Sequence, residues 1–362
     1  MKILIAGGGT GGHLFPGVAI AEEFRRRNGT NSVLFIGTKR GLEARVLPQF
    51  GFDLETLEVE GIKGRGMARS LAALLKIPRS LIQSRRIIRG FGPDIVIGVG
   101  GYASGPAVLA ARLMGTPTAI AEQNAIPGET NKILGRFADR IFVSFPETSR
   151  WFRPDRVRVT GNPIRAAIAG AHQRVRKPGE PFGLLIFGGS QGAHRINLAM
   201  AEALPRLAAL RGRLQFLHAT GAQDAAQMRE AYREGGWRAR VEPFFEDMAA
   251  AYAAADFVVA RSGASTVFEL AALGKPALLV PYPFAANDHQ RLNAEAMVGL
   301  GAAWILLDAY CDGPRLAATV QAAAEKPEAL RAMGEKARAL ARPEAAERIV
   351  ELLERAAAPP RG

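Results

Sequence analysis

The sequence predicts an α/β protein made of two Rossmann-like domains, each with a parallel sheet. Its 362 residues exceed the ~100–200 residues of a typical domain, which favours two domains. Short aliphatic runs alternate with longer helical patterns, as in strand–helix–strand units. Segments 3–12 and 184–193 each run from an apolar strand into a glycine-rich turn. Because these segments open the two halves of the chain, they predict the same local fold twice.

The candidate strands are short and nearly continuous in hydrophobic residues, as expected where helices cover both faces of a parallel sheet. In the first half they are residues 2–6, 32–37, 53–59, 95–100, 118–122, 140–145 and 156–160. In the second half they are residues 183–187, 214–220, 240–244, 256–261, 276–281 and 302–306.

A hinge is predicted at Gly161-Asn162-Pro163, a turn-forming sequence between the halves. The expected domains are therefore residues 1–162 and 163–342. After Pro343 the chain reads as an amphipathic helix, which we expect to pack back on the first domain within residues 343–362. The apolar residues at helical spacing are Ala346, Ile349, Val350 and Leu353.

The composition excludes several classes of protein. With 48% hydrophobic and 22% charged residues the chain is not disordered as a whole. Its single cysteine, Cys311, excludes a disulfide framework and a multi-cysteine metal site, and no neighbouring residue in the sequence indicates an activated thiol. No apolar run reaches the ~18 residues of a membrane span, and the first residues do not read as a secretory signal, so we expect no secretion.

Glycine turns follow several of the candidate strands. Segment 7–12 matches G-x-G-x-x-G, where glycines let a phosphate approach the backbone at a helix N-terminus. The second strand ends without the carboxylate of a dinucleotide site, and no P-loop lysine follows. Similar turns occur at 98–106 and 188–192. Together they predict a cleft for an extended phosphorylated ligand, although a single turn of this kind can also bind nothing.

Beyond these turns, short motifs occur in a specific order along the chain. They are Gly9-Thr10-Gly11-Gly12-His13 with Pro16, Gly100-Gly101-Tyr102, Glu122-Gln123-Asn124, Gly161-Asn162-Pro163-Ile164-Arg165, Gly188-Gly189-Ser190-Gln191-Gly192, Arg261-Ser262-Gly263-Ala264, Glu269 and Asp288-His289-Gln290. This set resembles the MurG family of peptidoglycan glycosyltransferases, over nearly the whole chain. Each motif is modest alone, but their order is specific.

The resemblance implies a GT-B fold, with a cleft between the two domains. It implies that N-acetylglucosamine moves from UDP-N-acetylglucosamine to the muramyl C4 hydroxyl of lipid I with inversion, giving lipid II and UDP. It implies no cofactor and no catalytic metal. The partners expected from it are both substrates, an anionic membrane surface and other proteins of cell-wall synthesis and division. The expected location is peripheral, on the cytoplasmic face of the plasma membrane.

The resemblance also implies roles for individual residues. Glu269 would accept hydrogen bonds from the ribose hydroxyls, since a carboxylate offers only acceptors. The residues implied at the diphosphate are Arg165, Ser190 and Gln191. Those implied elsewhere on the donor are Phe245, Ala264, Ser265, Thr266, His289 and Gln290. Those implied at the transferred sugar and acceptor are Thr10, Gly11, Gly12, His13 and Asn124.

The general base is the least determined of these roles. His13 is the first candidate, because an imidazole accepts protons near neutral pH. Alternatively, His13 buttresses its loop or only binds substrate. Glu122 is the competing candidate. The family commonly has histidine before this glutamate, whereas this chain has Ala121.

Residues 61–93 carry eight basic side chains and no acidic one, within a net charge of +13. Basic and apolar residues together at helical spacing favour docking on an anionic membrane. Alternatively, this is a core helix with a basic outer face. No nucleic-acid-binding signature accompanies it, so nucleic acid is not an expected partner. The predicted docking residues are Leu74, Leu75, Lys76, Ile77, Arg79, Leu81, Ile82, Arg85 and Arg86.

Two other functions remain open from the sequence. One is a UDP-N-acetylglucosamine 2-epimerase-like enzyme on the same fold, which would need additional acid and base residues. The other is a nucleotide-sugar-binding protein without catalysis, which would bind UDP-sugar but form no product.

Overall fold

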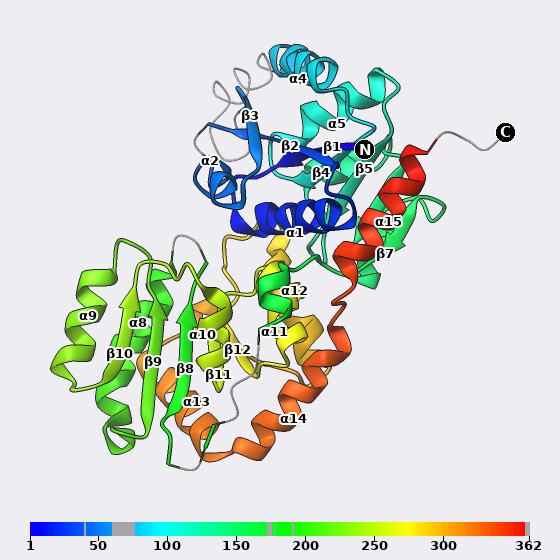
Figure 1. The fold of residues 1–362 in the computed structure, drawn as a ribbon. Helices are drawn as coiled ribbons and strands as arrows, with labels where there is room; N and C mark the ends of the chain where they lie inside the picture. Colours follow the sequence, from blue (N-terminus) through cyan, green and yellow to red (C-terminus); the bar gives the residue numbers. More distant parts are fainter. Residues whose placement is uncertain (40, 60–76, 172–175, 178, 190–191, 359–362) are drawn as a thin grey trace. The chain divides into compact units, whose positions relative to one another are not determined.

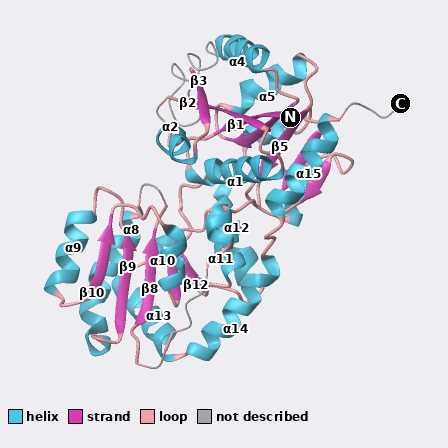
Figure 2. Cartoon of the chain, in the orientation of Figure 1, coloured by secondary structure: helices cyan, strands magenta, loops and turns pink. Residues whose placement is uncertain are grey.

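The computed structural model describes residues 1–39, 41–59, 77–171, 176–177, 179–189 and 192–358 (Figure 1). It divides into two units, one of Met1–Arg165 with Arg342–Gly362 and one of Ala166–Ala341. Each unit contains one parallel sheet with helices against it, which confirms the predicted fold class (Figure 2). The first boundary lies just after the predicted hinge.

The sheet of the first unit has the order β3-β2-β1-β4-β5-β6-β7, with parallel neighbours throughout. Its strands are β1 (Lys2–Gly7), β2 (Ser32–Thr38), β3 (Asp53–Leu57), β4 (Ile95–Gly100), β5 (Thr118–Glu122), β6 (Arg140–Val143) and β7 (Val157–Val159). Strand β6 ends two residues earlier than predicted, and the 3-10 helix η2 (Pro146–Trp151) follows it.

Helices cover both faces of this sheet (Figure 1). On one face, α1 (Gly11–Arg27) contributes apolar residues such as Val18 and Phe24 to a core shared with β1 and β2. On the other face, α4 (Ile77–Phe91) and α5 (Ser104–Leu113) lie against the opposite side chains of the strands. The described part of this unit also contains α2 (Glu43–Val46), η1 (Leu47–Phe50) and α6 (Glu129–Leu134).

The last helix, α15 (Ala345–Ala357), belongs to the first unit although it follows the second in sequence. It packs beside α1, and Ile349, Val350 and Leu353 are fully buried in the same core. At its first turn, Ala345 is buried rather than the predicted Ala346. An ion pair of 2.6 Å joins Arg27 on α1 to Glu354.

The sheet of the second unit has the order β10-β9-β8-β11-β12-β13, the order of the first sheet without its last strand. Its strands are β8 (Phe182–Phe187), β9 (Leu214–Ala219), β10 (Arg238–Glu242), β11 (Phe257–Ala260), β12 (Ala277–Leu279) and β13 (Trp304–Ile305). The internal repeat seen in the sequence is therefore a repeat of topology.

Helices also line this second sheet. One core joins the strands to α8 (His194–Ala203), α9 (Ala225–Glu234) and α13 (Gly313–Glu325). The other helices are α7 (Ala166–Ala169), η3 (Leu204–Leu210), α10 (Met248–Ala254), α11 (Ala264–Leu273), η4 (Ala286–Asp288), α12 (His289–Gly299), η5 (Asp308–Tyr310), α14 (Pro327–Ala337) and η6 (Arg338–Leu340). Cys311 lies buried here, and burial raises the pKa of its thiol to about 11, as suits an inert cysteine.

The strand order places the site loops. In each sheet, the order reverses at the strand that opens the unit: β1 lies between β2 and β4, and β8 lies between β9 and β11. Ligands of open α/β sheets bind beyond the carboxyl ends of the strands at this switch point. The glycine turns follow β1, β4 and β8, and α11 follows β11. The glycine turns and the start of α11 therefore lie at the switch points, whereas Asn124 after β5 and Gln290 after β12 lie farther along their sheets.

Candidate active site

In the first unit, the turns after β1 and β4 lie against each other. The Gly8 amide donates to the Gly100 carbonyl at 3.3 Å. Gly100 has φ +95°, and a Cβ there would lie 2.5 Å from Nδ1 of His13. Only glycine at position 100 therefore leaves room for the His13 imidazole against the turn after β4. Residues from two motifs 87 positions apart, His13 and Gly100, therefore lie against each other.

His13 is oriented by Gln123, which lies just after β5. Its Nδ1 is 3.2 Å from Oε1 of Gln123, whose Nε2 donates to the Ala121 carbonyl. Gln123 is 1% exposed, so its amide has little freedom to turn. Because Oε1 is an acceptor, Nδ1 of His13 must carry the proton. Nε2 is then the nitrogen with a lone pair, and it can accept a proton.

Glu122 lies beside Gln123 but has a different environment. It is 2% exposed, and both of its carboxylate oxygens accept hydrogen bonds. The Asn124 backbone amide and side chain donate to Oε1, while the Gly128 amide and the Asn131 side chain donate to Oε2. These bonds hold the segment after β5 on helix α6. Both carboxylate oxygens are therefore hydrogen-bonded to residues near Glu122 in the sequence.

A second carboxylate of this unit, Glu43, was missed by the sequence analysis. It lies on the short helix α2, is fully buried, and accepts a 2.7 Å hydrogen bond from the Gly9 amide. The sequence predicted that the amides of this glycine turn could bind a phosphate. In the structure, the Gly9 amide instead donates a hydrogen bond to the carboxylate of Glu43. The only signal in the sequence is the position of Glu43 shortly after two glycines, Gly37 and Gly41.

In the second unit, Glu269 lies in helix α11 and is 7% exposed. Tyr252 of α10 donates a 2.9 Å hydrogen bond to its Oε2. The tyrosine ring packs edge-on against Phe187 at the end of β8, with centroids 5.9 Å apart. Sequence reasoning found Glu269 but not Tyr252, because a tyrosine in a hydrophobic helix carries no separate signal.

Gln290 is also held in one orientation. Its Oε1 accepts from the Tyr282 amide at 3.0 Å, so its NH₂ group is directed elsewhere. Its carbonyl accepts from Ser262, which follows β11. The turn before it contains Asn287 at φ +55° and Asp288 at φ +53°. Such backbone angles are unfavourable for residues other than glycine, and they often accompany functional sites.

The other predicted residues are placed as follows. Ala264, Ser265 and Thr266 form the first turn of α11, and the Thr10 side chain does not cap α1. Phe245 is buried with the Arg240 guanidinium 5.1 Å from its ring centre.

Arg165 extends over the Phe15 ring of α1, 4.1 Å from its centre, within the first unit. His289 lies at the start of α12, with its Nδ1 2.7 Å from the Ala286 carbonyl. Ser190 and Gln191, predicted at the diphosphate, lie outside the described residues.

Comparison with known families decides the class. The family model of the glycosyltransferase family 28 N-terminal domain matches residues 3–143, and that of the C-terminal domain matches residues 183–349. The chain belongs to glycosyltransferase family 28. The two models correspond to the two sheets, and the second also reaches α15.

Relatives within family 28 share nearly the whole chain. A protein of Syntrophus aciditrophicus (strain SB) is 54% identical over 351 residues, 97% of each chain. One of Myxococcus xanthus (strain DK1622) is 48% identical, over 97% of this chain and 92% of that one. Both are named UDP-N-acetylglucosamine–N-acetylmuramyl-(pentapeptide) pyrophosphoryl-undecaprenol N-acetylglucosamine transferase.

Solved structures agree with this family. MurG of Acinetobacter baumannii has a TM-score of 0.77 and 31% identity, covering 98% of this chain and 99% of that one. The resemblance to the MurG family is thereby confirmed. A UDP-GlcNAc 2-epimerase from Neisseria meningitidis has a TM-score of 0.68 at 15% identity, over 98% and 100% of the chains. That likeness shows a shared fold alone.

Proposed function

We propose that this family 28 protein transfers N-acetylglucosamine from UDP-N-acetylglucosamine to the muramyl C4 hydroxyl of lipid I, giving lipid II and UDP. The observation that carries the proposal is the 54% identity, over 97% of both chains, to a transferase named for this reaction. The site residues of both units are compatible with it.

The donor would be bound mainly by residues of the second unit, with Arg165 of the first unit. Glu269 would accept hydrogen bonds from the ribose hydroxyls. The hydrogen bond from the Tyr252 hydroxyl sets the direction of its carboxylate. Gln290 presents its NH₂ group to a sugar oxygen, because its Oε1 is held by the Tyr282 amide. Arg165, Ser190 and Gln191 would face the diphosphate, whose charge grows as UDP leaves. Fixed donors at such a position lower the barrier.

His13 would act as the general base. The acceptor hydroxyl oxygen attacks the anomeric carbon of N-acetylglucosamine, and the bond from that carbon to the diphosphate oxygen breaks. The bonding electrons leave with UDP, and the hydroxyl proton moves to Nε2 of His13. Attack from the face opposite UDP inverts the anomeric centre and gives a β linkage. Gln123 supports this role because it fixes the proton on Nδ1.

Glu122 is a poorer base in this arrangement. Its carboxylate already accepts bonds from Asn124, Gly128 and Asn131. Protonation would weaken all of these, because a carboxyl group with a proton has fewer acceptor sites. We therefore assign Glu122 to holding the segment that carries Asn124.

Helix α4 and its surroundings would dock on the membrane from which lipid I is taken. Ile82 is 63% exposed and Leu113 on α5 is 76% exposed. They line a groove between α4 and α5 together with Leu81, Arg85 and Arg89. Apolar side chains bordered by arginines suit an anionic lipid surface. No described helix is long and apolar enough to cross a membrane.

Not all predicted docking residues contribute equally. Arg85 and Arg86 are exposed, whereas Leu81 is partly packed against the core. Arg79 is exposed but pairs with Glu58 at 3.2 Å. Leu74, Leu75 and Lys76 lie outside the described residues, as does the Ile77 side chain.

A transfer assay tests the proposed function. Purified protein receives radiolabelled UDP-N-acetylglucosamine and a lipid I analogue in the presence of EDTA, and label in the lipid product is counted. A matched acceptor lacking the C4 hydroxyl should give none. Binding of UDP without product would favour a non-catalytic protein, and formation of a 2-epimer of the UDP-sugar would favour the epimerase.

A further inference from the structure

We propose that Glu43 is a positioning residue for the first glycine turn, acting as a built-in anion where such turns ordinarily bind a phosphate. The turn leads directly into Thr10–His13, so its position decides where the proposed base lies. The expected effect on the transfer rate rests on the proposed function. The expected effect on the structure of the turn does not depend on that function.

The Glu43 carboxylate joins the ends of two neighbouring strands. Oε2 accepts from the Gly9 amide at 2.7 Å, just after β1. Oε1 accepts from the amide and the hydroxyl of Thr38, at 2.7 and 2.8 Å, at the end of β2. The side chain is 0% exposed. A fully buried carboxylate needs such compensation, because an ionised group without partners is very unfavourable in the interior.

Glycines leave the space that this carboxylate occupies. A Cβ on Gly8 would lie 2.5 Å from Cδ of Glu43, and one on Gly37 would lie 2.5 Å from its Cγ. A Cβ on Gly41 would also overlap the carboxylate. One glycine of the turn after β1 and two of the stretch from the end of β2 to α2 thus enclose one side chain. This arrangement resembles an anion-binding site in which the Glu43 carboxylate takes the place of a bound anion.

The turn is consequently held on both sides. The Gly8 amide is bound to the Gly100 carbonyl, and the Gly9 amide is bound to Glu43. Helix α1 begins at Gly11, and His13 lies in its first turn. Because a base acts only within a narrow range of distances, a shift of the turn moves His13 out of reach.

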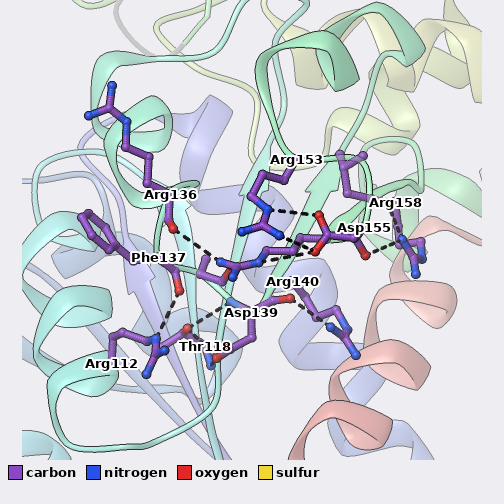
Figure 3. Close-up of polar contacts among 12 residues, drawn as sticks. Arg112, Thr118, Arg136, Phe137, Asp139, Arg140, Arg153, Asp155 and Arg158 are labelled. Atoms are coloured by element: carbon purple, nitrogen blue, oxygen red, sulfur yellow. Dashed lines mark hydrogen bonds and ion pairs between the residues drawn. The ribbon is translucent and has the colours of Figure 1, made fainter.

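The same unit offers a matched control at the opposite end of the sheet. Oδ2 of Asp139, just before β6, accepts from the amide and the hydroxyl of Thr118 at 2.9 Å each. Figure 3 shows this pair with the arginines near it. Asp139 therefore makes the contacts to a threonine that Glu43 makes, but it touches no glycine turn.

The test compares Glu43→Gln, Glu43→Ala and Asp139→Ala in the full-length protein. Both oxygens of Glu43 accept from backbone amides, so the NH₂ group of the glutamine would face a donor in either orientation. We expect kcat/KM for the lipid I analogue to fall by about 10²-fold in both Glu43 variants. UDP affinity, measured by calorimetry, should stay near the wild-type value, since the proposed nucleotide residues other than Arg165 lie in the second unit. Asp139→Ala should keep wild-type kinetics.

Chemical rescue of Glu43→Ala shows whether the negative charge of the Glu43 side chain is needed or only its volume. Formate can enter the space left in Glu43→Ala, and it should raise kcat/KM about tenfold. Formamide, which has the same size but no charge, should not. Equal rescue by both, or wild-type kinetics in Glu43→Gln, would overturn the proposal.

A readout without catalysis keeps this inference apart from the proposed function. Hydrogen–deuterium exchange of the segment around Gly9 should be faster in both Glu43 variants and unchanged in Asp139→Ala. If the wild-type protein forms no lipid product, the proposed function fails, and exchange alone decides the role of Glu43. Wild-type exchange in both Glu43 variants would overturn that role.

Discussion

The Tyr252 hydroxyl donates a 2.9 Å hydrogen bond to Oε2 of Glu269, and the two side chains are 0% and 7% exposed. A bond to one carboxylate oxygen fixes the plane of the group and thereby the direction of the second oxygen. The proposed ribose acceptor is therefore oriented before nucleotide arrives, which reduces the ordering required on binding.

Replacing Tyr252 by phenylalanine should weaken UDP binding by about tenfold, since it removes one hydrogen bond to a charged group. The change should be much smaller for 2′,3′-dideoxy-UDP, which has no ribose hydroxyls for Glu269. Calorimetric titration of both nucleotides measures the difference.

Tyr232→Phe is the control for this variant, because Tyr232 is another buried tyrosine of the same unit, bonded to His218 instead. It should lower stability but keep UDP affinity. Equal weakening of both nucleotides by Tyr252→Phe would contradict a role through Glu269.

Substitution of His13 by alanine should lower kcat by about 10²–10⁴-fold, the usual contribution of a general base. UDP affinity should not change. Added imidazole should restore part of the rate in proportion to its unprotonated fraction. A full rate without imidazole would exclude His13 as the base.

Gln123→Leu tests the orientation of that base. It removes the acceptor at 3.2 Å from Nδ1 of His13, so both tautomers become available. We expect kcat to fall by up to about 10²-fold, with a normal KM for UDP-N-acetylglucosamine. Single-turnover rates at saturating substrate measure this, and an unchanged rate would argue against the assigned tautomer.

His218 makes stability depend on pH. Burial lowers its pKa from 6.5 to about 3, although Asp224 opposes this. The folded protein therefore keeps the imidazole neutral, while the unfolded chain binds a proton below about pH 6.5. The free energy of unfolding should fall by up to about 1.4 kcal/mol per pH unit between pH 6.5 and 3.

Urea denaturation of wild type and His218→Gln at pH 7.5 and 5 measures this pH dependence of the free energy of unfolding. The variant should be less stable at pH 7.5, because it disturbs the bonds to Tyr232 and Asn197. Its loss of stability on acidification should be smaller than that of wild type. An identical pH dependence would assign the effect to other groups.

Removal of positive charge from α4 should reduce membrane binding. Arg85→Ser with Arg86→Ser should weaken binding to phosphatidylglycerol vesicles by about fivefold per charge. The control is Arg233→Ser with Arg331→Ser, two exposed arginines of the second unit. Co-sedimentation measures the partition, and equal losses in both double variants would show a net-charge effect instead.

The sequence predicted the strands and the glycine turns well, because these depend on local patterns. Every predicted strand is present, and β4 and β5 have the predicted ends. Continuous aliphatic runs indicate buried strands wherever they lie in the fold. Shifts at other ends, such as that of β6 before Pro146, reflect which backbone groups find partners.

The ordered motifs also predicted the family, and so the substrate class. They did not predict which side chains hold the proposed site residues in place. His13 and Gln123 are 110 residues apart, Gly9 and Glu43 are 34 apart, and Tyr252 and Glu269 are 17 apart. Each pair is joined across different elements of its unit.

The sequence by itself therefore determined the α/β class, the repeated domain and the motifs proposed to carry the chemistry. Only the tertiary structure decided that Glu43 occupies the first turn, that Gln123 sets the tautomer of His13, and that Glu122 is engaged with its own loop. The reason is physical: hydrogen-bond partners of a buried group depend on which strands become neighbours in the sheet. That order follows from packing of the whole unit, not from any local pattern.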